Sequence, residues 1–275
     1  MFCDRTLAAR IEAAEVDLLA AACANVQRRL PAATTLPIGG GLAAITEPGS
    51  PLNKVAGLGF QPFDATAWPA IVAAHARRGL PVQVELSTLA DPELGVFFTE
   101  RGHRLVAVEN VLGRRLAVAQ SLGTSPPDGI TVTAVLTTEL PRWLDVMVTG
   151  FAAPDAEGPT PEVFDRAVLE RVIGDFAAAD GVELFLAHRD GHVAGAAAMR
   201  MRRGIAQLCG ASTLPAHRRR GVQTTLLAHR LARAAHSCDL CIVTTQPGSK
   251  SMQNALRAGF VLLYARNVLL APAAT

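Results

Sequence analysis

The hydrophobic pattern in the first part of the chain alternates between helical and strand-like spacing. Leu7, Ile11 and Leu18 recur on one helix face and predict a helix over residues 4–29. The Gly39-Gly40-Gly41 stretch is interpreted as a turn, because no Gly-Lys-Ser/Thr follows that would make it a phosphate loop. The other elements expected before residue 119 are helices over 65–78 and 92–101 and strands over 42–46, 54–59, 82–88 and 105–112.

The pattern after residue 129 predicts a second series of elements. Thr160 is the expected N-cap of a helix over 161–179, with Pro161 as its first residue. Asp190-Gly191 and Arg203-Gly204 are expected hairpin turns that join three consecutive strands, 182–187, 193–202 and 205–213. The remaining elements are strands over 130–136, 240–245 and 261–270 and helices over 142–151, 222–235 and 249–258.

The two parts of the chain repeat each other at an offset of 157 residues. Gly102 corresponds to Gly259, and Asn110-Val111-Leu112 corresponds to Asn267-Val268-Leu269, while the order of predicted elements agrees over the same offset. A duplication is the better interpretation of this agreement. The Ser125-Pro126-Pro127-Asp128-Gly129 stretch suits a linker. We therefore expect domains over 1–118 and 130–275, joined by a linker over 119–129.

Composition and charge narrow the class of protein. Half of the 275 residues are hydrophobic, 18% are charged and the mean hydropathy is +0.26, which excludes a disordered chain. The formal net charge of +2 is too small to indicate a nucleic-acid partner. No apolar stretch reaches the ~18 uninterrupted residues of a membrane helix, and the first residues lack the apolar core of a signal peptide. We therefore expect a soluble, cytoplasmic protein that binds neither nucleic acid nor membrane.

The cysteines are odd in number and scattered, which argues against a disulfide framework and fits a reducing compartment. They are Cys3, Cys23, Cys209, Cys238 and Cys241. Cys238 and Cys241, with His236 nearby, resemble half of a metal site, but no second pair of ligands accompanies them. We expect two thiols in the core and no bound metal.

The segment with the clearest chemistry is the basic run before the helix predicted at Val222. His217-Arg218-Arg219-Arg220-Gly221 lies between Pro215, which ends a strand, and the start of that helix. Unpaired N–H groups and the helix dipole make such a position an anion site, and arginines add charged hydrogen bonds. Gly221 would let a phosphate approach the main chain. A solvated turn or a nucleic-acid patch is the alternative, but this placement favours a loop that binds a pyrophosphate.

These residues resemble the signature of the GNAT acyltransferase superfamily, Arg/Gln-x-x-Gly-x-Gly/Ala, which opens the helix after the fourth strand. Arg218, Gly221 and Gln223 stand at the signature positions, and Gln223 departs from the usual small residue. Gly259-Phe260, before the last strand, matches a second feature of the family. The resemblance implies an α/β (α+β) GNAT fold, with a mixed, mostly antiparallel sheet flanked by helices, and here in two copies.

The resemblance also implies where CoA binds. The loop would hold the pyrophosphate, and the end of the preceding strand would pair with the pantetheine arm. The residues expected at the cofactor are Ser212, Thr213, Leu214, Arg218, Arg219, Arg220, Gly221, Val222, Gln223 and Thr224. In the first half, the offset sets Gln61-Pro62-Phe63-Asp64-Ala65-Thr66 opposite residues 218–223. That segment has no arginine or glycine, and Asp64 would repel a phosphate, so we expect a degenerate copy without a cofactor loop.

The catalytic residues are not identified by the sequence. Some relatives place a glutamate base where this chain has Gln207, and many place a tyrosine acid where it has Ala255. Tyr264, the only tyrosine, lies instead in the last predicted strand. Ser249, Ser251 and Cys209 are candidates for donating a proton to the leaving thiolate.

The expected function is transfer of an acyl group from CoA to an amine of a small molecule or peptide. The expected acyl group is acetyl, with acetyl-CoA as the donor. The amine would attack the thioester directly, aided by proximity and polarisation of the carbonyl. One alternative is a CoA-binding sensor or interaction protein without turnover, because Gln207 and Ala255 replace the usual catalytic groups. A more distant one is an anion- or nucleic-acid-binding module that uses the same arginines.

Overall fold

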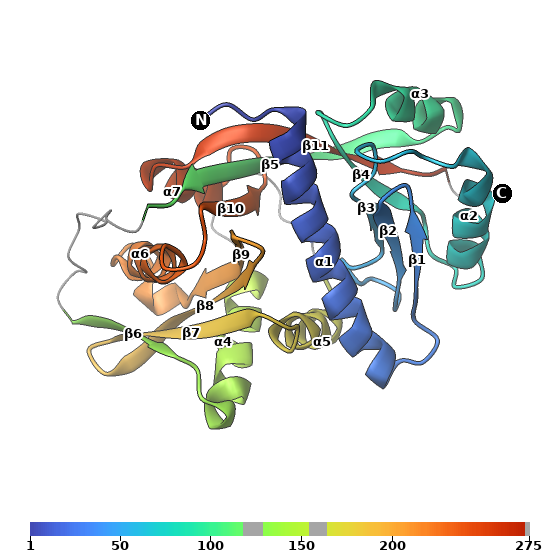
Figure 1. Ribbon diagram of the computed structural model, residues 1–275. Coiled ribbons are helices and arrows are strands. Elements are labelled where there is room, and N and C mark those ends of the chain that lie inside the picture. Colours follow the sequence, from blue (N-terminus) through green and yellow to red (C-terminus); the bar gives the residue numbers. More distant parts are fainter. Residues whose placement is uncertain (118–128, 154–163, 273–275) are drawn as a thin grey trace. The chain divides into compact units, whose positions relative to one another are not determined.

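The computed structural model describes residues 1–117, 129–153 and 164–272, and its chain divides into two compact units (Figure 1). The first unit comprises Met1–Val111, Thr245–Pro247 and Leu262–Thr275, and the second comprises Leu112–Thr244 and Gly248–Val261. The end of the chain thus groups with the first unit, whereas one break at the linker would place it with the second. The assignment of a cofactor-free domain to 1–118 and a transferase domain to 130–275 stays a prediction, and nearly all of the proposed linker lies outside the described residues.

The first unit contains a long helix and a mixed sheet. Asp4 caps helix α1 by accepting a hydrogen bond from the Leu7 amide at 2.8 Å, and the helix then buries one apolar face that includes Ile11 and Leu19. Its elements are α1 (Arg5–Arg29), β1 (Thr34–Ile38), β2 (Gly41–Ile45), β3 (Lys54–Ala56), η1 (Ala65–Ala67), α2 (Trp68–Ala76), β4 (Gln83–Ser87), α3 (Pro92–Glu100) and most of β5 (Arg104–Arg115) and β11 (Val261–Leu270). Residues from Leu112 onward in β5, and Val261 in β11, belong to the second unit. The strand order is β1-β2-β3-β4-β11-β5. β3 and β4 are parallel, whereas the β1–β2, β2–β3 and β4–β11 pairs are antiparallel.

Strand β1 is an element that the sequence analysis missed. Its fourth residue is Pro37, and proline cannot donate to a sheet ladder. The structure places β1 at the edge of the sheet, where Pro37 is exposed and its missing N–H costs nothing. The predicted turn is confirmed: Gly39 and Gly40 have φ of 54° and 76°, and they join β1 to β2.

A buried network of charges in the first unit binds the last strand to the first helix. Arg266 of β11 is 1% exposed, and its Nε donates to the Glu12 Oε1 of α1 at 2.8 Å. The Tyr264 hydroxyl donates to the same oxygen at 2.6 Å. Arg266 also lies 3.8 Å from Glu109. Because removing one partner of a buried pair costs ~3–5 kcal/mol, this network favours packing of β11 against α1.

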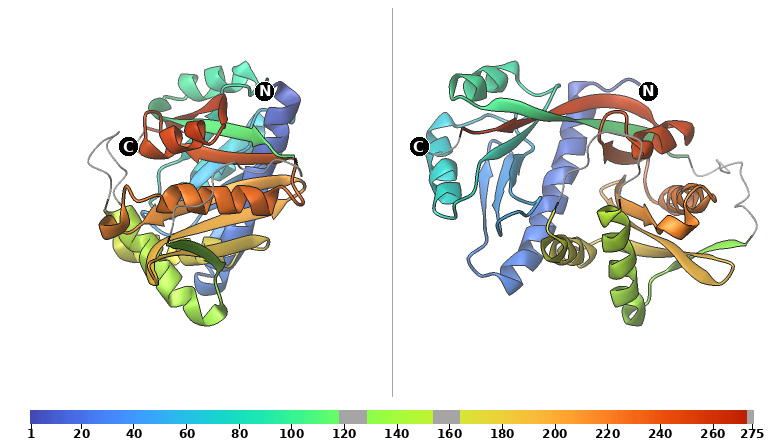
Figure 2. Two further views of the ribbon diagram at one scale, coloured as in Figure 1. Left: turned by 90° about the vertical axis from the view of Figure 1, so that its left-hand side faces the viewer. Right: turned by 180° about the vertical axis from the view of Figure 1, so that it is seen from behind.

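The second unit is a sheet covered by helices on both faces (Figures 1 and 2). Its elements are β6 (Ile130–Ala134), η2 (Thr137–Glu139), α4 (Leu140–Ala152), α5 (Arg166–Ala177), β7 (Val182–Arg189), β8 (His192–Arg202), β9 (Ile205–Thr213), η3 (Pro215–His217), α6 (Val222–Ala234), β10 (Leu240–Thr245) and α7 (Lys250–Arg257). The strand order is β10-β9-β8-β7-β6, antiparallel except for the β9–β10 pair. Alternate residues of β8 enter two cores, one with Leu226 of α6 and one with Trp143 of α4.

The predicted turns of the second unit are confirmed, and one helix start is not where the sequence suggested. Asp190 and Gly191 have φ of 52° and 80°, and Arg203 and Gly204 have φ of 50° and 75°, as tight hairpin turns require. Helix α5 begins at Arg166, where the Asp165 carboxylate accepts hydrogen bonds from two amides of the first turn. The expected cap Thr160 and first residue Pro161 lie outside the described residues.

The last four elements of the first series, α2, β4, α3 and β5, recur in the same order as the last four elements of the second series. Shifting α2, β4, α3 and β5 by 157 gives 225–233, 240–244, 249–257 and 261–272, which overlap α6, β10, α7 and β11. The preceding strand also pairs in parallel with the next one in both cases, β3 with β4 and β9 with β10. The structure therefore has the repeated α/β architecture that the sequence predicted.

Candidate functional site

The start of helix α6 has the geometry of an anion site. Arg219 and Gly221 both have left-handed backbone conformations, with φ of 60° and 84°. Gly221 is the N-cap and supplies no side-chain cap, and the first bond of the helix runs from the Thr225 amide to the Gly221 carbonyl at 2.9 Å. The amides of residues 222–224 therefore have no acceptor within the helix and point out of its end. Such a nest of N–H groups suits the oxygens of a phosphate.

The arginines predicted at the cofactor lie around this helix start. Arg219 and Arg220 are exposed. Arg218 is half-buried, and its guanidinium donates to the Ala153 carbonyl at the end of α4. The fold thus brings a concentration of positive charge to the amides of the loop, as binding of a pyrophosphate requires.

Two buried polar atoms beside the loop support its assignment as a ligand site. Thr213 Oγ1 at the end of β9 and His217 Nδ1 in η3 have no hydrogen-bond partner within the described part of the chain. Buried polar groups normally find a partner, so an unsatisfied pair next to an anion site is typical of a place that a polar ligand completes. The residues present therefore fit a CoA diphosphate.

The edge of β9 is open beyond the middle of the strand. The parallel pairing with β10 covers only Leu240–Ile242 opposite Ile205–Gln207, although β9 continues to Thr213 and β10 to Thr245. From residue 208 onward, β9 has no pairing with β10 among the described residues. An extended amide-containing chain such as pantetheine could add to this edge through main-chain hydrogen bonds.

A β-bulge deforms β9 along this open edge. Ala197 pairs with Ala211 and Met199 pairs with Leu208, so Cys209 and Gly210 both oppose the single residue between Ala197 and Met199. Gly210 has φ of 95°, a conformation that favours glycine. A bulge re-aims main-chain groups locally, so this one decides where the amides of the strand end point.

Ser212, Leu214 and Val222, three other predicted cofactor residues, make contacts within the fold. The Ser212 hydroxyl donates to the Val146 carbonyl of α4 at 2.8 Å, and Val222 is 1% exposed in the core. The Leu214 amide donates to the Ala194 carbonyl at 3.0 Å. Gln223 is half-buried and Thr224 exposed in the first turn of α6.

The sequence analysis missed two glycines that allow this packing. A Cβ on Gly195 of β8 would lie 2.7 Å from the Ser212 carbonyl oxygen and 2.8 Å from Val222. A Cβ on Gly150 of α4 would lie 2.2 Å from the Ser212 Cβ. Both glycines therefore let neighbouring elements approach the strand end closely. A glycine inside an apolar strand is the signal that could have identified Gly195.

The groups considered for proton transfer are mostly engaged elsewhere. The Cys209 thiol donates to the Gln207 carbonyl at 3.3 Å, and Gln207 itself is buried. Ser249 Oγ caps α7 by accepting from the Met252 amide at 3.2 Å. Tyr264 lies in the first unit, where its hydroxyl is bonded to Glu12.

Ser251 is the remaining candidate, and Ala255 stands where the family resemblance led us to look for a tyrosine acid. Ser251 is exposed on α7, and Ala255 packs in the core. We assign no catalytic acid or base.

Cys238 and Cys241 pack in the core as predicted, with 8% and 0% exposure. Burial raises the pKa of the Cys241 thiol to about 12, so it stays protonated at neutral pH. Among the described residues, no group of three His, Cys, Asp or Glu side chains is arranged to hold a metal ion. In the same part of the chain, no helix combines the length and the apolar character needed to cross a bilayer.

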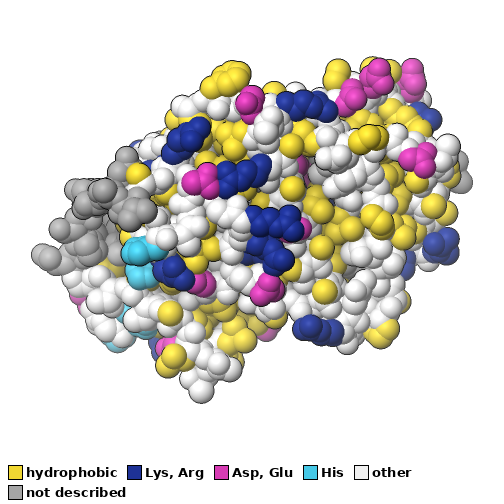
Figure 3. All heavy atoms as spheres, in the orientation of Figure 1, with side chains coloured by type: hydrophobic (Ala, Val, Ile, Leu, Met, Phe, Trp, Pro, Cys, Tyr) yellow, Lys and Arg dark blue, Asp and Glu magenta, His cyan; other side chains and the backbone are white. Residues whose placement is uncertain are grey.

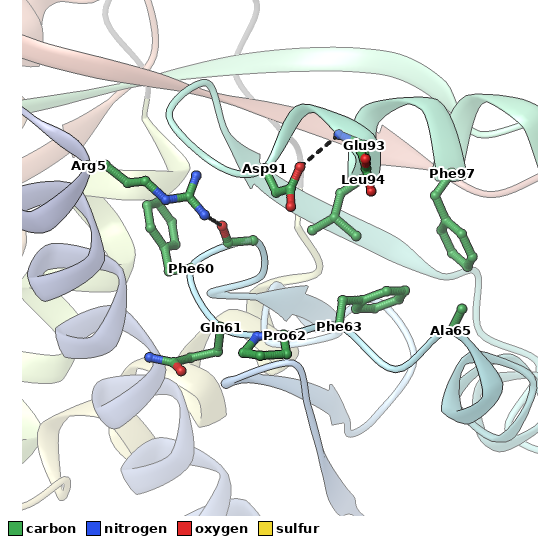
Figure 4. A pocket seen from close by; sticks show the side chains of 11 residues that line it. Arg5, Phe60, Gln61, Pro62, Phe63, Ala65, Asp91, Glu93, Leu94 and Phe97 are labelled. Atoms are coloured by element: carbon green, nitrogen blue, oxygen red, sulfur yellow. Dashed lines mark hydrogen bonds between the residues drawn. The ribbon is translucent and has the colours of Figure 1, made fainter.

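The segment of the first unit that corresponds to the loop lines a cavity of about 550 Å³ (Figure 4). Phe60, Phe63 and Phe97 give this cavity an aromatic lining, and Arg5 lies at its rim with its guanidinium bonded to the Gly59 carbonyl. Asp64 caps η1, and hydrogen bonds from Thr66 lower the pKa of its carboxyl, which is therefore ionised at neutral pH. The loss of CoA binding in this half remains a prediction.

Comparison with known proteins places this site in a family. Residues 148–260 match the acetyltransferase (GNAT) family, whereas no curated protein sequence matches the chain. The structure resembles a GCN5-related N-acetyltransferase from Kribbella flavida, with 19% identity, a TM-score of 0.67 and coverage of 98% of this chain and 96% of that one.

Two further solved structures share the fold. A tandem GNAT protein from the clavulanic acid biosynthesis pathway is 13% identical, with a TM-score of 0.59 and coverage of 86% and 79%. A GCN5-related N-acetyltransferase from Sphaerobacter thermophilus is 16% identical, with a TM-score of 0.52 and coverage of 80% and 73%. At such identities the structural likeness shows only the fold. The family assignment of residues 148–260 comes from their sequence match to the GNAT family. The second half of the chain therefore contains a GNAT-family acetyltransferase domain, matched over residues 148–260, in a chain of tandem-like length.

Proposed function

We propose that the second unit transfers an acetyl group from acetyl-CoA to an amine of a small-molecule or peptide acceptor. Acyl transfer from CoA is the general activity of the family. The observation that carries the proposal for this chain is the start of α6, where two left-handed residues expose three amides beside three arginines. This loop would bind the CoA pyrophosphate, and the open edge of β9 would bind the pantetheine arm.

The reaction needs positioning more than acid–base chemistry. The amine nitrogen attacks the thioester carbonyl carbon, the C–S bond breaks, and the proton lost from nitrogen balances the CoA thiolate. Amides of β9 near the bulge would stabilise the negative charge that develops on the carbonyl oxygen. Alignment of the two reactants supplies the rest of the rate enhancement. No protein base is assigned, so the acceptor would enter as the free amine.

The decisive test is binding and turnover of acetyl-CoA by the full chain. Calorimetry should detect binding of acetyl-CoA to the protein. Free CoA thiol should then be released when small-molecule and peptide amines are added as acceptors. Mass spectrometry of the purified protein under native conditions should show bound CoA. Failure to bind acetyl-CoA would contradict the proposal.

A CoA-binding sensor without turnover is the second candidate. It is favoured by the buried Gln207 and Ala255, which stand where relatives carry acid–base groups. Binding of CoA without thiol release from any amine in the panel would support it.

A nucleic-acid module is a weaker candidate. On the face drawn in Figure 3, basic side chains are interspersed with acidic and apolar ones and form no continuous basic surface. DNA binding that falls steeply with salt and ignores CoA would favour this function. We propose that the protein is cytoplasmic and that it binds neither nucleic acid nor a membrane.

A further inference from the structure

Arg230 places a guanidinium inside the apolar layer between α6 and the sheet of the second unit. The residue is 2% exposed, and Leu226, Leu227 and Leu231 of the same helix belong to the surrounding core. Burial lowers the pKa of Arg230 to about 10, which still leaves the side chain charged at neutral pH. Burying a charge costs free energy that burying an apolar residue does not, so Arg230 needs an explanation other than core packing.

All hydrogen bonds that Arg230 makes with the described residues end on main-chain carbonyls. Nε donates to the Leu226 carbonyl of α6 at 3.2 Å. Nη1 donates to the Ala198 carbonyl of β8 at 3.1 Å and to the Gly210 carbonyl of β9 at 3.3 Å. Ala198 is the residue opposite the bulge, and Gly210 is one of the two residues in it. One nitrogen therefore bridges the two strands where their own ladder is interrupted.

We infer that Arg230 is a positioning residue that holds the β9 bulge in the shape that polarises the acyl carbonyl of bound acetyl-CoA. This inference rests on the proposed function. A bulge interrupts the ladder and leaves main-chain groups that the strands cannot pair. With Arg230 in place, the Ala198 and Gly210 carbonyls accept from the guanidinium, and the peptide groups of the bulge keep one orientation. The amides that face the open edge are then fixed relative to the thioester.

The bulge does not depend on Arg230 alone for its existence. Trp143 of α4, in the core on the other face of the sheet, donates from Nε1 to the Ala197 carbonyl at 3.1 Å. Gly210 also packs closely, since a Cβ there would lie 3.3 Å from Met147 and 3.4 Å from Phe151. Replacing Arg230 by Met should therefore leave a folded protein in which the bulge is less well ordered. CoA binding at the start of the helix should survive.

The test is an infrared measurement on bound acetyl-CoA labelled at its carbonyl carbon, with no acceptor present. In the wild-type protein, the carbonyl band should shift to lower frequency than in buffer, as polarisation by hydrogen bonds requires. Arg230→Met should lose most of that shift while its Kd for acetyl-CoA stays within about threefold. Arg230→Lys, which keeps a buried donor, should recover part of the shift. Arg233→Met is the matched control, because Arg233 lies on the same helix, is exposed and bonds to Glu183 at 2.6 Å.

The kcat of each variant should fall in step with the loss of its carbonyl-band shift. Removing one oxyanion donor typically lowers kcat by ~100- to 1000-fold, and we expect Arg230→Met, which misaligns such donors, to lose ~10-fold or more. A carbonyl band that is unshifted in the wild type, or equally shifted in wild type and Arg230→Met, would overturn the inference and leave acetyl-CoA binding intact. Should Arg230→Met not fold, the same comparison between wild type and Arg230→Lys decides, because Lys can satisfy only part of the bridge. A wild-type protein that does not bind acetyl-CoA would overturn the proposed function itself.

Discussion

Replacing Gly221 by Glu is the most direct perturbation of the proposed cofactor loop. Gly221 is the N-cap of α6 with φ of 84°, and the amides of residues 222–224 follow it without an intrahelical acceptor. A carboxylate at this position would compete for those amides and repel the CoA pyrophosphate. Its side chain would also occupy the space next to the main chain that a phosphate needs.

The expected loss of affinity follows from the hydrogen bonds that would be displaced. Bonds to a charged group contribute ~1.5–3 kcal/mol each, and at least two amides would lose their phosphate. A loss above ~3 kcal/mol corresponds to more than a hundredfold in Kd. A non-glycine residue in the left-handed region costs a further ~1–2 kcal/mol of folding stability, but this loss does not depend on CoA.

Titration calorimetry with CoA on three variants separates these effects. Gly221→Ala carries the same backbone cost and adds a Cβ but no charge, so its melting temperature should fall like that of Gly221→Glu while its loss of CoA affinity should be smaller. Asp64→Ala, in the corresponding segment of the first unit, should leave CoA affinity nearly unchanged. If Gly221→Glu is folded and binds CoA like the wild type, the loop is not the pyrophosphate site.

Further expectations concern stoichiometry and pH. One acetyl-CoA should bind per chain and stabilise the fold by about 2.7 kcal/mol at ~100 times its Kd, a rise of several degrees in Tm; two sites by calorimetry would contradict the degenerate first half. The acetylation rate should rise with pH toward the pKa of each acceptor amine, whereas a common plateau near neutral pH would reveal a protein base. Burial first, and Glu85 next, raise the pKa of Glu109 to about 7 from 4.5, so the folded state binds more protons than the unfolded state between these values. Stability should therefore fall as pH rises from about 4.5 to 7, and Glu109→Gln should reduce this fall, by at most ~3 kcal/mol, in urea unfolding measured across that range.

Local patterns were sufficient to predict most elements of both units. Dipeptides that end in glycine, such as Asp190-Gly191, specify a tight turn whatever surrounds them, because few residues accept positive φ. The basic loop was equally readable, since a strand end, a glycine and a helix start lie next to one another in the chain. Its geometry in the structure follows from the same local conformations, with Gly221 left-handed at the N-cap. The conformation of the loop could therefore be predicted before any tertiary contact was known.

Other features depended on contacts between distant residues. The bulge at Cys209 and Gly210 exists only through the register of β9 on β8, and Arg230 reaches it from a helix that sequence patterns marked simply as amphipathic. Nothing in the sequence around Arg230 indicates the bulge, and nothing around the bulge indicates Arg230.

By itself, the sequence determined the succession of helices, strands and turns, the repeat at 157 residues and the position of the basic loop before a helix, because each depends on neighbouring residues or on periodicity. Tertiary structure alone decided that β11 pairs with β4 in the first unit. Glu12 and Arg266 stand at opposite ends of the chain, and nothing in either neighbourhood indicates that they meet. Their pairing is stable only where burial strengthens the attraction and both charges are satisfied at once, a condition set by the packed fold and not by any local stretch of sequence.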